Sequence, residues 1–201
     1  MSEKNRSEKK IEKKTIVLLG DCNVGKTRII KKYINPEDNE IEDSSIGINT
    51  IKKEIDNNNI LKIVDTSGQE RNKGITHSVY KKADAFIVVF DMNNQESYND
   101  IKFWIDLIEN NRIKDTIIYV VGNKTNGGDS KELKEIKNFL IEHREYEKSL
   151  IDNIHYEEVN LENNFNIDKI FQGIIEHIDD SNLVKQREVN NQASRGICNL
   201  Y

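Results

Sequence analysis

The residues best suited to chemistry form a short stretch bounded by glycines near the start of the chain. Gly20, Gly25, Lys26 and Thr27 have the spacing G-x-x-x-x-G-K-[ST] of a phosphate-binding loop. The two glycines allow the backbone to curl so that its N–H groups point inward toward anionic oxygens. The residues between them, which complete this candidate cradle, are Asp21, Cys22, Asn23 and Val24.

The end of this stretch supplies a charge and a hydroxyl. Lys26 is suited to the β- and γ-phosphates, and Thr27 can offer its hydroxyl to Mg²⁺. The loop follows the apolar run 15–19 and opens a helix expected to begin near Lys26, whose positive end attracts anions. A glycine-rich turn without a ligand is the alternative, and a strand and a helix on the correct sides disfavour it.

A second polar loop follows the apolar residues 61–64. It contains Asp65, whose carboxylate at a strand end can hold Mg²⁺, usually through water. Gly68 can offer a backbone N–H to a γ-phosphate, and Gln69 can orient an attacking water. Taken alone, a segment of this kind is more often an ordinary strand-to-helix turn. Together with the phosphate loop, it favours a magnesium-dependent phosphate site.

The elements that must position these loops follow from hydrophobic patterning. Continuous apolar runs predict buried parallel strands at residues 15–19, 85–90, 116–121 and 154–159. Apolar residues at helical spacing occur within residues 101–108, 133–141 and 167–178. Residues 46–55 and 60–65, joined by a turn at 56–59, predict a hairpin that adds one antiparallel edge strand. We therefore expect an α/β fold with a doubly wound, mostly parallel six-stranded sheet.

Size and composition limit the possible classes of protein. With 201 residues, 36% of them hydrophobic and 32% charged, the chain fits one domain. We expect this domain at residues 14–184, between flexible tails at 1–13 and 185–201. The net charge of −5 without a long basic run argues against nucleic-acid binding. No secretory signal or bilayer-length apolar run is present, and two cysteines fit a reducing, cytoplasmic setting.

Six stretches together resemble a known family. They are residues 20–27, 44–49, 65–71, 79–83, 89–97 and 122–124. In them the chain resembles a small GTPase of the Ras superfamily, most closely the Rab family, across residues 15–178. The resemblance implies the small G-protein form of the P-loop NTPase fold, binding of GTP and GDP with Mg²⁺, and GTP hydrolysis with low intrinsic activity.

The resemblance also implies partners and a location. Rab-like proteins act in vesicle-mediated transport on the cytoplasmic face of intracellular membranes. Their partners are effectors, exchange factors and GTPase-activating proteins. Ser45 corresponds to the Mg²⁺ ligand of the first switch, where the family usually has threonine. A γ-phosphate would hold the segments around Ser45 and Gly68, and hydrolysis would release them. An ordinary polar loop is the alternative for Ser45.

The base-recognition residues depart from the family pattern. The family's Asn-Lys-x-Asp corresponds to Asn123, Lys124 and, in place of the aspartate, Asn126. An amide offers one acceptor and one donor group where a carboxylate offers two acceptor oxygens. We expect weaker guanine binding, by about 1.5–3 kcal/mol for each charge-assisted bond lost. Asp129, behind two glycines, is a candidate replacement carboxylate.

Other family contacts to the base are altered as well. The Ser-Ala-Lys loop of the family corresponds here to Asn160, Leu161 and Glu162. The aromatic residue that covers guanine corresponds to Asp38, with Tyr33 as a nearby candidate substitute. These losses motivate a second hypothesis, a degenerate GTPase-fold interaction module that binds nucleotide weakly. A third, a P-loop kinase or ATPase, is disfavoured by the Asp65 motif and by Ser45.

Further departures from the family occur in the phosphate loop and near the end of the sequence. Cys22 and Asn23 replace the usual serine and glycine of the phosphate loop, and asparagine tolerates the left-handed backbone that glycine adopts. Cys198 is fourth from the end of the sequence, as in a prenylation motif, but Tyr201 is an atypical last residue. A prenylated cysteine, which would anchor the chain to a membrane, and a free tail cysteine both remain open.

Overall fold

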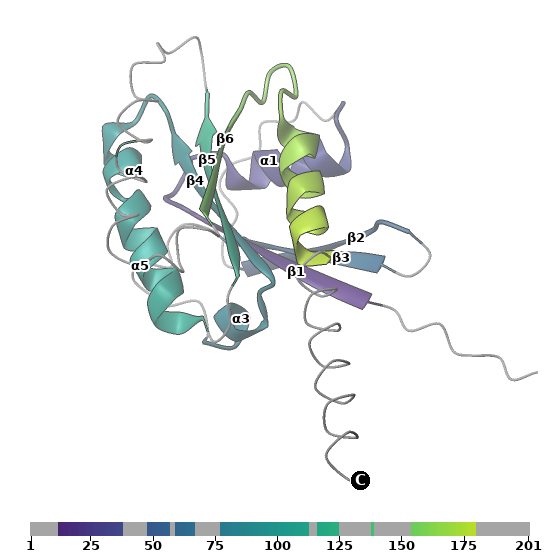
Figure 1. Cartoon of the computed structure of the whole chain (residues 1–201). Helices are drawn as coiled ribbons and strands as arrows, with labels where there is room; N and C mark the ends of the chain where they lie inside the picture. Colours follow the sequence, from purple (N-terminus) through teal and green to yellow (C-terminus); the bar gives the residue numbers. More distant parts are fainter. Residues whose placement is uncertain are drawn as a thin grey trace, which may run out of the picture.

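A six-stranded sheet forms the centre of the structure (Figure 1). The structure is a computed structural model, which describes residues 12–37, 48–56, 59–66, 77–112, 116–124, 138 and 154–179. The strands are β1 (Glu12–Leu19), β2 (Ile48–Glu54), β3 (Asn59–Thr66), β4 (Ala85–Asp91), β5 (Ile117–Asn123) and β6 (Ile154–Val159). The helices are α1 (Lys26–Ile34), α3 (His77–Lys82), α4 (Gln95–Asn99), α5 (Ile101–Asn111) and residues 167–179.

The strand order is β2-β3-β1-β4-β5-β6, and only β2 runs antiparallel to its neighbour. The predicted fold class and the hairpin at the sheet edge are therefore confirmed. β1 lies between β3 and β4, so β2 and β3 are added on one side of it and β4, β5 and β6 on the other. In an open α/β sheet, such a change of side places the loop that follows the strand at a ligand-binding crevice.

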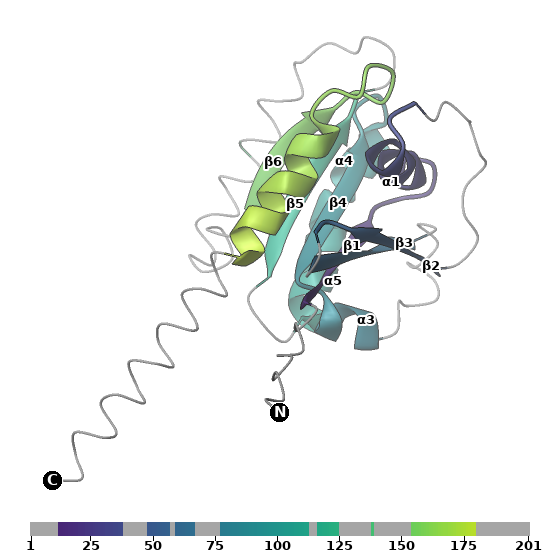
Figure 2. The same ribbon diagram turned by 90° about the vertical axis from the view of Figure 1, so that its right-hand side faces the viewer.

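Apolar residues cover both faces of the sheet, because side chains alternate along each strand. In β1, Ile16 and Leu18 belong to the cluster with α1 and the helix of residues 167–179. Val17 and Leu19 belong to the cluster with α3 and α5. Figures 1 and 2 show the resulting layers, with α4 and α5 on one side of the sheet and α1 on the other.

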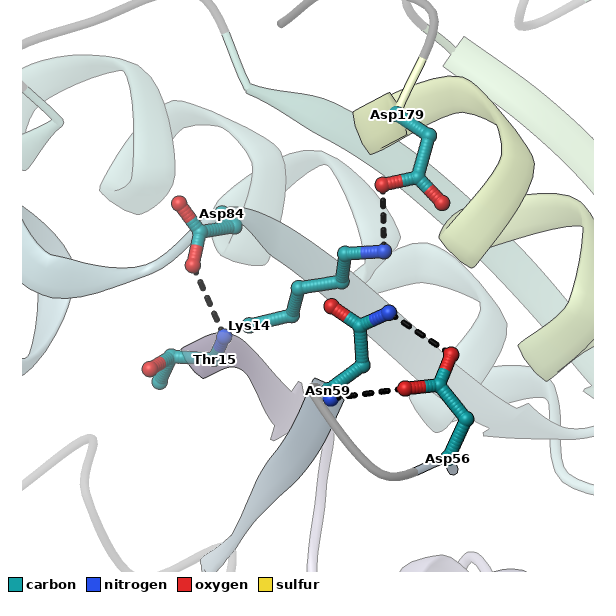
Figure 3. Close-up of polar contacts among 6 residues, drawn as sticks. All are labelled: Lys14, Thr15, Asp56, Asn59, Asp84 and Asp179. Carbon is teal, nitrogen blue, oxygen red and sulfur yellow. Dashed lines mark hydrogen bonds and ion pairs between the residues drawn. The ribbon is translucent and has the colours of Figure 1, made fainter. Parts of the chain in front are cut away.

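Polar contacts fix the end of the sheet that lies away from the phosphate loop (Figure 3). The buried ammonium of Lys14 in β1 forms an ion pair with Asp179, at the end of the helix of residues 167–179. The Thr15 N–H donates to Asp84 Oδ2 over 2.8 Å. The predicted hairpin turn is closed by Asp56, whose carboxylate accepts from Asn59 N at 2.9 Å. The first two contacts thus tie the start of β1 to the helix of residues 167–179 and to the residue that precedes β4, and the third is local to the β2–β3 hairpin.

Part of the sequence prediction falls outside the described residues. The helical spacing within 133–141 lies there, except for residue 138, which is helical. The tail boundaries at 1–13 and 185–201 remain predictions. Within the part of the chain that the structure describes, no helix is long and apolar enough to cross a membrane.

Candidate phosphate-binding site

The loop between β1 and α1 has the curled backbone that the motif predicts. Gly20 and Gly25 have φ angles of 133° and 101°, which residues with a Cβ rarely adopt. A Cβ on Gly20 would lie 2.1 Å from the Val89 carbonyl oxygen, and one on Gly25 would lie 2.5 Å from Asn123 Nδ2. Glycine is therefore required at both positions for two reasons. The backbone angles disfavour other residues, and β4 at Gly20 and β5 at Gly25 leave no room for a Cβ.

Asn23 adopts the backbone conformation expected from its residue type. Its φ of 64° lies in the left-handed region, which asparagine enters more readily than most residues. The loop therefore forms with asparagine at a position where the family usually has glycine. The neighbouring Cys22 thiol is exposed.

The ammonium of Lys26 is held inside this loop. Lys26 is only 4% exposed, and its Nζ donates to the carbonyl oxygens of Gly20 at 2.9 Å and Asp21 at 2.5 Å. A buried lysine needs such partners, since an ionised amine without them is costly to bury. The positive charge is thus fixed at the curl of the loop, beside the start of α1, where the helix dipole also favours anions.

Thr27, the residue after Lys26, contacts Asp65. The Thr27 hydroxyl donates to Asp65 Oδ2 over 2.7 Å, and Asp65 is 1% exposed at the end of β3. The following residue, Thr66, donates its hydroxyl to the Leu18 carbonyl oxygen at 2.7 Å, which holds the end of β3 against β1. A buried carboxylate beside a hydroxyl is a pair of hard oxygen ligands, which fits Mg²⁺. Burial of an anion also favours a nearby cation.

On the far side of the loop, Asn123 joins the end of β5 to the phosphate loop. Its side chain is buried, and Nδ2 donates to the Val24 carbonyl oxygen over 2.9 Å. Its Oδ1 has no hydrogen-bond partner among the described residues. The backbone N–H of Lys124 donates to the Val159 carbonyl oxygen at 2.8 Å, which brings the loop after β6 to the same place.

The loop after β6 is closed by its own side chains. Asn160 Oδ1 accepts from the Glu162 N–H at 2.8 Å, and the backbones of Asn160 and Phe165 pair with each other. Leu161 is buried, and its Cδ1 would lie 3.4 Å from a Cβ on Gly25. Leu161 therefore lies beside Gly25 of the phosphate loop, while the correspondence of residues 160–162 to the family's base loop remains a prediction.

Comparison with known proteins identifies the family to which this arrangement belongs. The model of the Ras family matches residues 15–180. The chain belongs to the Ras family. This match confirms the predicted membership of the Ras superfamily and its P-loop fold.

Several curated Rab proteins are similar to this Ras-family chain. Ras-related protein Rab-19 of Mus musculus is 33% identical over 113 residues, which cover 55% of this chain and 52% of that protein. Ras-related protein RabT1 of Dictyostelium discoideum is 36% identical over 115 residues, which cover 54% of this chain and 51% of that protein. Ras-related protein Rab-12 of Mus musculus is 28% identical over 166 residues, which cover 81% of this chain and 66% of that protein. The match thus spans about half the length of Rab-19 and RabT1.

One expectation about the base side of this Ras-family site is wrong. Tyr33 does not lie where it could replace the missing aromatic over a base, because it is part of the core at 6% exposure. Its ring stacks on Phe171 with centroids 3.8 Å apart, and Lys53 Nζ lies 3.6 Å from the ring centroid. Burial, and secondly the charge of Asp168, raise the pKa of the Tyr33 hydroxyl.

The structure brings together one set of predicted site residues, and a second set lies outside the described residues. The residues brought together are Gly20, Asp21, Cys22, Asn23, Val24, Gly25, Lys26, Thr27, Asp65, Asn123 and Lys124. The predicted residues outside the described part of this Ras-family chain are Asp38, Ser45, Gly68, Gln69, Asn126, Asp129 and Cys198.

Two contacts at the site were not predicted from sequence. Asn123 binds the loop through Val24, although the motif suggested only a role toward the base. Trp104 of α5 donates its indole N–H to Asp21, whereas helical spacing had suggested only a core position. Because a buried indole N–H usually finds an acceptor, the single tryptophan of this sequence was a signal for the second contact.

Proposed function

We propose that this protein is a molecular switch that binds GTP and GDP with Mg²⁺ and hydrolyses GTP slowly. The observation that carries the proposal is the convergence of three groups at the curled loop. They are the Lys26 ammonium, the Thr27 hydroxyl and the Asp65 carboxylate. Family membership and the similarity to Rab proteins support the same assignment.

In this proposal, each group has a separate task. The loop N–H groups and Lys26 bind the β- and γ-phosphates, and the helix dipole of α1 adds to their field. Thr27 and Asp65 hold Mg²⁺, which would neutralise charge on the phosphate oxygens. Gln69 orients the attacking water. Without an arginine supplied by a partner, hydrolysis in this family of sites is slow, so low intrinsic activity is expected.

The switching itself involves Ser45 and Gly68. In the proposed GTP state, Ser45 contacts Mg²⁺ and the Gly68 N–H contacts the γ-phosphate, so both segments are held near the loop. Loss of that phosphate removes both contacts, and the surface seen by effectors changes. Exchange factors and GTPase-activating proteins would then set the balance between the two states.

We further propose a role in vesicle-mediated transport, on the cytoplasmic face of an intracellular membrane. Similarity to Rab proteins motivates this role, and Cys198 offers a site for a C-terminal lipid. Mass measurement of the chain expressed in eukaryotic cells tests the anchor. An added prenyl mass that is lost in Cys198→Ser supports it, and an unmodified wild-type chain contradicts it.

The altered base motif favours a second candidate, an interaction module that binds nucleotide weakly. Asn126 stands where the family has an aspartate, and the Asn160 side chain is engaged in its own turn with Glu162. Mass spectrometry of nucleotides released from freshly purified, denatured protein separates the candidates. Co-purifying GDP at about one per chain supports the switch, whereas an empty site supports the interaction module.

Hydrolysis requires its own test. Single-turnover cleavage of GTP by the wild-type protein should be slow but measurable, and Gln69→Leu should slow it further without weakening GTP binding. Equal rates in both proteins would remove Gln69 from the mechanism. Binding of GTP without any cleavage would limit the proposal to a nucleotide-binding protein.

A further inference from the structure

Trp104 and Asp21 form a direct contact between α5 and the phosphate loop. The indole Nε1 donates to Asp21 Oδ1 over 2.9 Å, although the two residues are 83 positions apart in the sequence. Trp104 is 1% exposed and packs in the apolar cluster of α3, α5 and the sheet. The donor is therefore fixed by the core, and its acceptor is a charged group of the candidate site.

We propose that Trp104 is a positioning residue for nucleotide binding, because it holds the Asp21 side chain and with it the phosphate loop. This inference rests on the proposed function. Asp21 has a second link, since its carbonyl oxygen accepts from Lys26 Nζ at 2.5 Å. One residue thus connects the buried indole of α5 to the lysine that would bind the phosphates.

The charge of Asp21 explains why such a contact is needed. A carboxylate within a loop that binds polyphosphate carries the same sign of charge as the ligand, and like charges at short range repel. A hydrogen bond from a fixed donor determines where that carboxylate lies. A bond to a charged acceptor is also stronger than one between neutral groups. Trp104 thereby keeps the Asp21 carboxylate on the α5 side of the loop.

A packing role for the Trp104 ring is the competing explanation, and the indole N–H distinguishes the two. Trp104→Phe keeps an aromatic ring but removes the donor. We expect it to raise the dissociation constant for GDP with Mg²⁺ about tenfold, the effect of losing one hydrogen bond to a charged group. In an Asp21→Ala background, the same change should alter affinity less than about twofold, since the acceptor is already gone.

The experiment is a double-mutant cycle with Trp104→Phe, Asp21→Ala and the double variant. Affinity and dissociation rate are measured with fluorescently labelled GDP and Mg²⁺, and thermal unfolding is recorded for each protein. Phe103→Leu is the matched control, because Phe103 is the exposed neighbour on the same helix and contacts the Trp104 ring edge-on. We expect the control to bind GDP as the wild type does.

A second measurement uses the wild-type tryptophan, the only one in the chain. Addition of GDP with Mg²⁺ should change its fluorescence, and the change at saturation should be smaller in Asp21→Ala. This arm does not depend on the folding of Trp104→Phe.

The outcomes separate the two levels of the proposal. A wild-type protein that binds no labelled GDP overturns the proposed function and this inference with it. If the wild type binds GDP, any of three results overturns the positioning role alone. The first is that Trp104→Phe loses no affinity, and the second is that it loses as much affinity in the Asp21→Ala background as in the wild type. The third result is a fluorescence change on GDP binding that is the same in Asp21→Ala as in the wild type.

Discussion

Thr27 and Asp65, 38 residues apart, meet through a 2.7 Å hydrogen bond between the first turn of α1 and the end of β3. The contact depends on the parallel pairing of β1 and β3, which brings the carboxyl ends of both strands to one edge of the sheet. The sheet topology thus assembles the candidate magnesium site, together with the loop of residues 20–25 that leads from the end of β1 to the first turn of α1.

Removal of the Thr27 hydroxyl tests this pair. Thr27→Val preserves the shape of the side chain but lacks the oxygen, so we expect magnesium-dependent GDP binding to weaken at least about tenfold. Thr27→Ser keeps the hydroxyl and should bind within about threefold of the wild type. Titration with and without Mg²⁺ measures both variants, and equal binding by all three proteins contradicts the proposed role.

The backbone of the loop gives a prediction for stability. Gly25→Ala places a methyl group 2.5 Å from Asn123 Nδ2 at a φ of 101°, so the free energy of unfolding should fall by about 1–3 kcal/mol. Asn23→Gly is the control, because glycine accepts the existing φ of 64° and should change stability by less than about 1 kcal/mol. Urea unfolding compares them, and a neutral Gly25→Ala is the contradicting result.

Restoring the family's aspartate tests the account of the base site. Asn126→Asp supplies two acceptor oxygens, so affinity for GTP should rise about tenfold or more while affinity for ATP does not. Asn126→Ala should show no such gain. Competition between labelled GTP, ATP and XTP gives the ranking. A wild-type preference for ATP contradicts the guanine assignment altogether.

The pH dependence of stability follows from His155 in β6. Its ring stacks on Tyr119 and lies 4.6 Å, centroid to centroid, from His177 on the helix of residues 167–179. Burial, and secondly the charge of His177, lower the pKa of His155, while Glu157 acts in the opposite direction.

A lowered pKa means that the folded protein binds this proton less readily than the unfolded chain. The contribution of neutral His155 to stability is therefore fully present above the ordinary histidine pKa of about 6.5, and it is lost as the pH falls below that value. His155→Gln should reduce the loss of melting temperature between pH 7.5 and 5.5. An equal loss in both proteins contradicts this role of His155.

Much of the fold and of the phosphate side followed from sequence, because local patterns determine both. The runs around Val17 and Phe86 are continuously apolar, as strands buried on both faces must be. Gly20 and Gly25 carry their own explanation in their φ angles. The expected tolerance of asparagine at position 23 also agrees with the structure.

Contacts between distant segments were not accessible in the same way. Trp104 has the helical spacing of a core residue, and Tyr33 lies near the first switch in sequence. Neither property shows which polar atom or aromatic ring the side chain contacts in the fold. Tyr33 was offered as a cover for the base, yet it packs on Phe171, 138 positions further along the chain. The contacts of both side chains are determined by tertiary packing, which cannot be derived from the pattern of a single sequence.

The most direct test of the central claim is calorimetric titration of nucleotide-stripped protein with GDP and GTP in the presence of Mg²⁺. The wild-type protein should give one-site binding heat, and Lys26→Ala should lose it or weaken it about 100-fold, since a charge-assisted phosphate contact disappears. Absence of heat with every nucleoside di- and triphosphate, or unchanged binding by Lys26→Ala, would contradict the claim that this loop binds the phosphates.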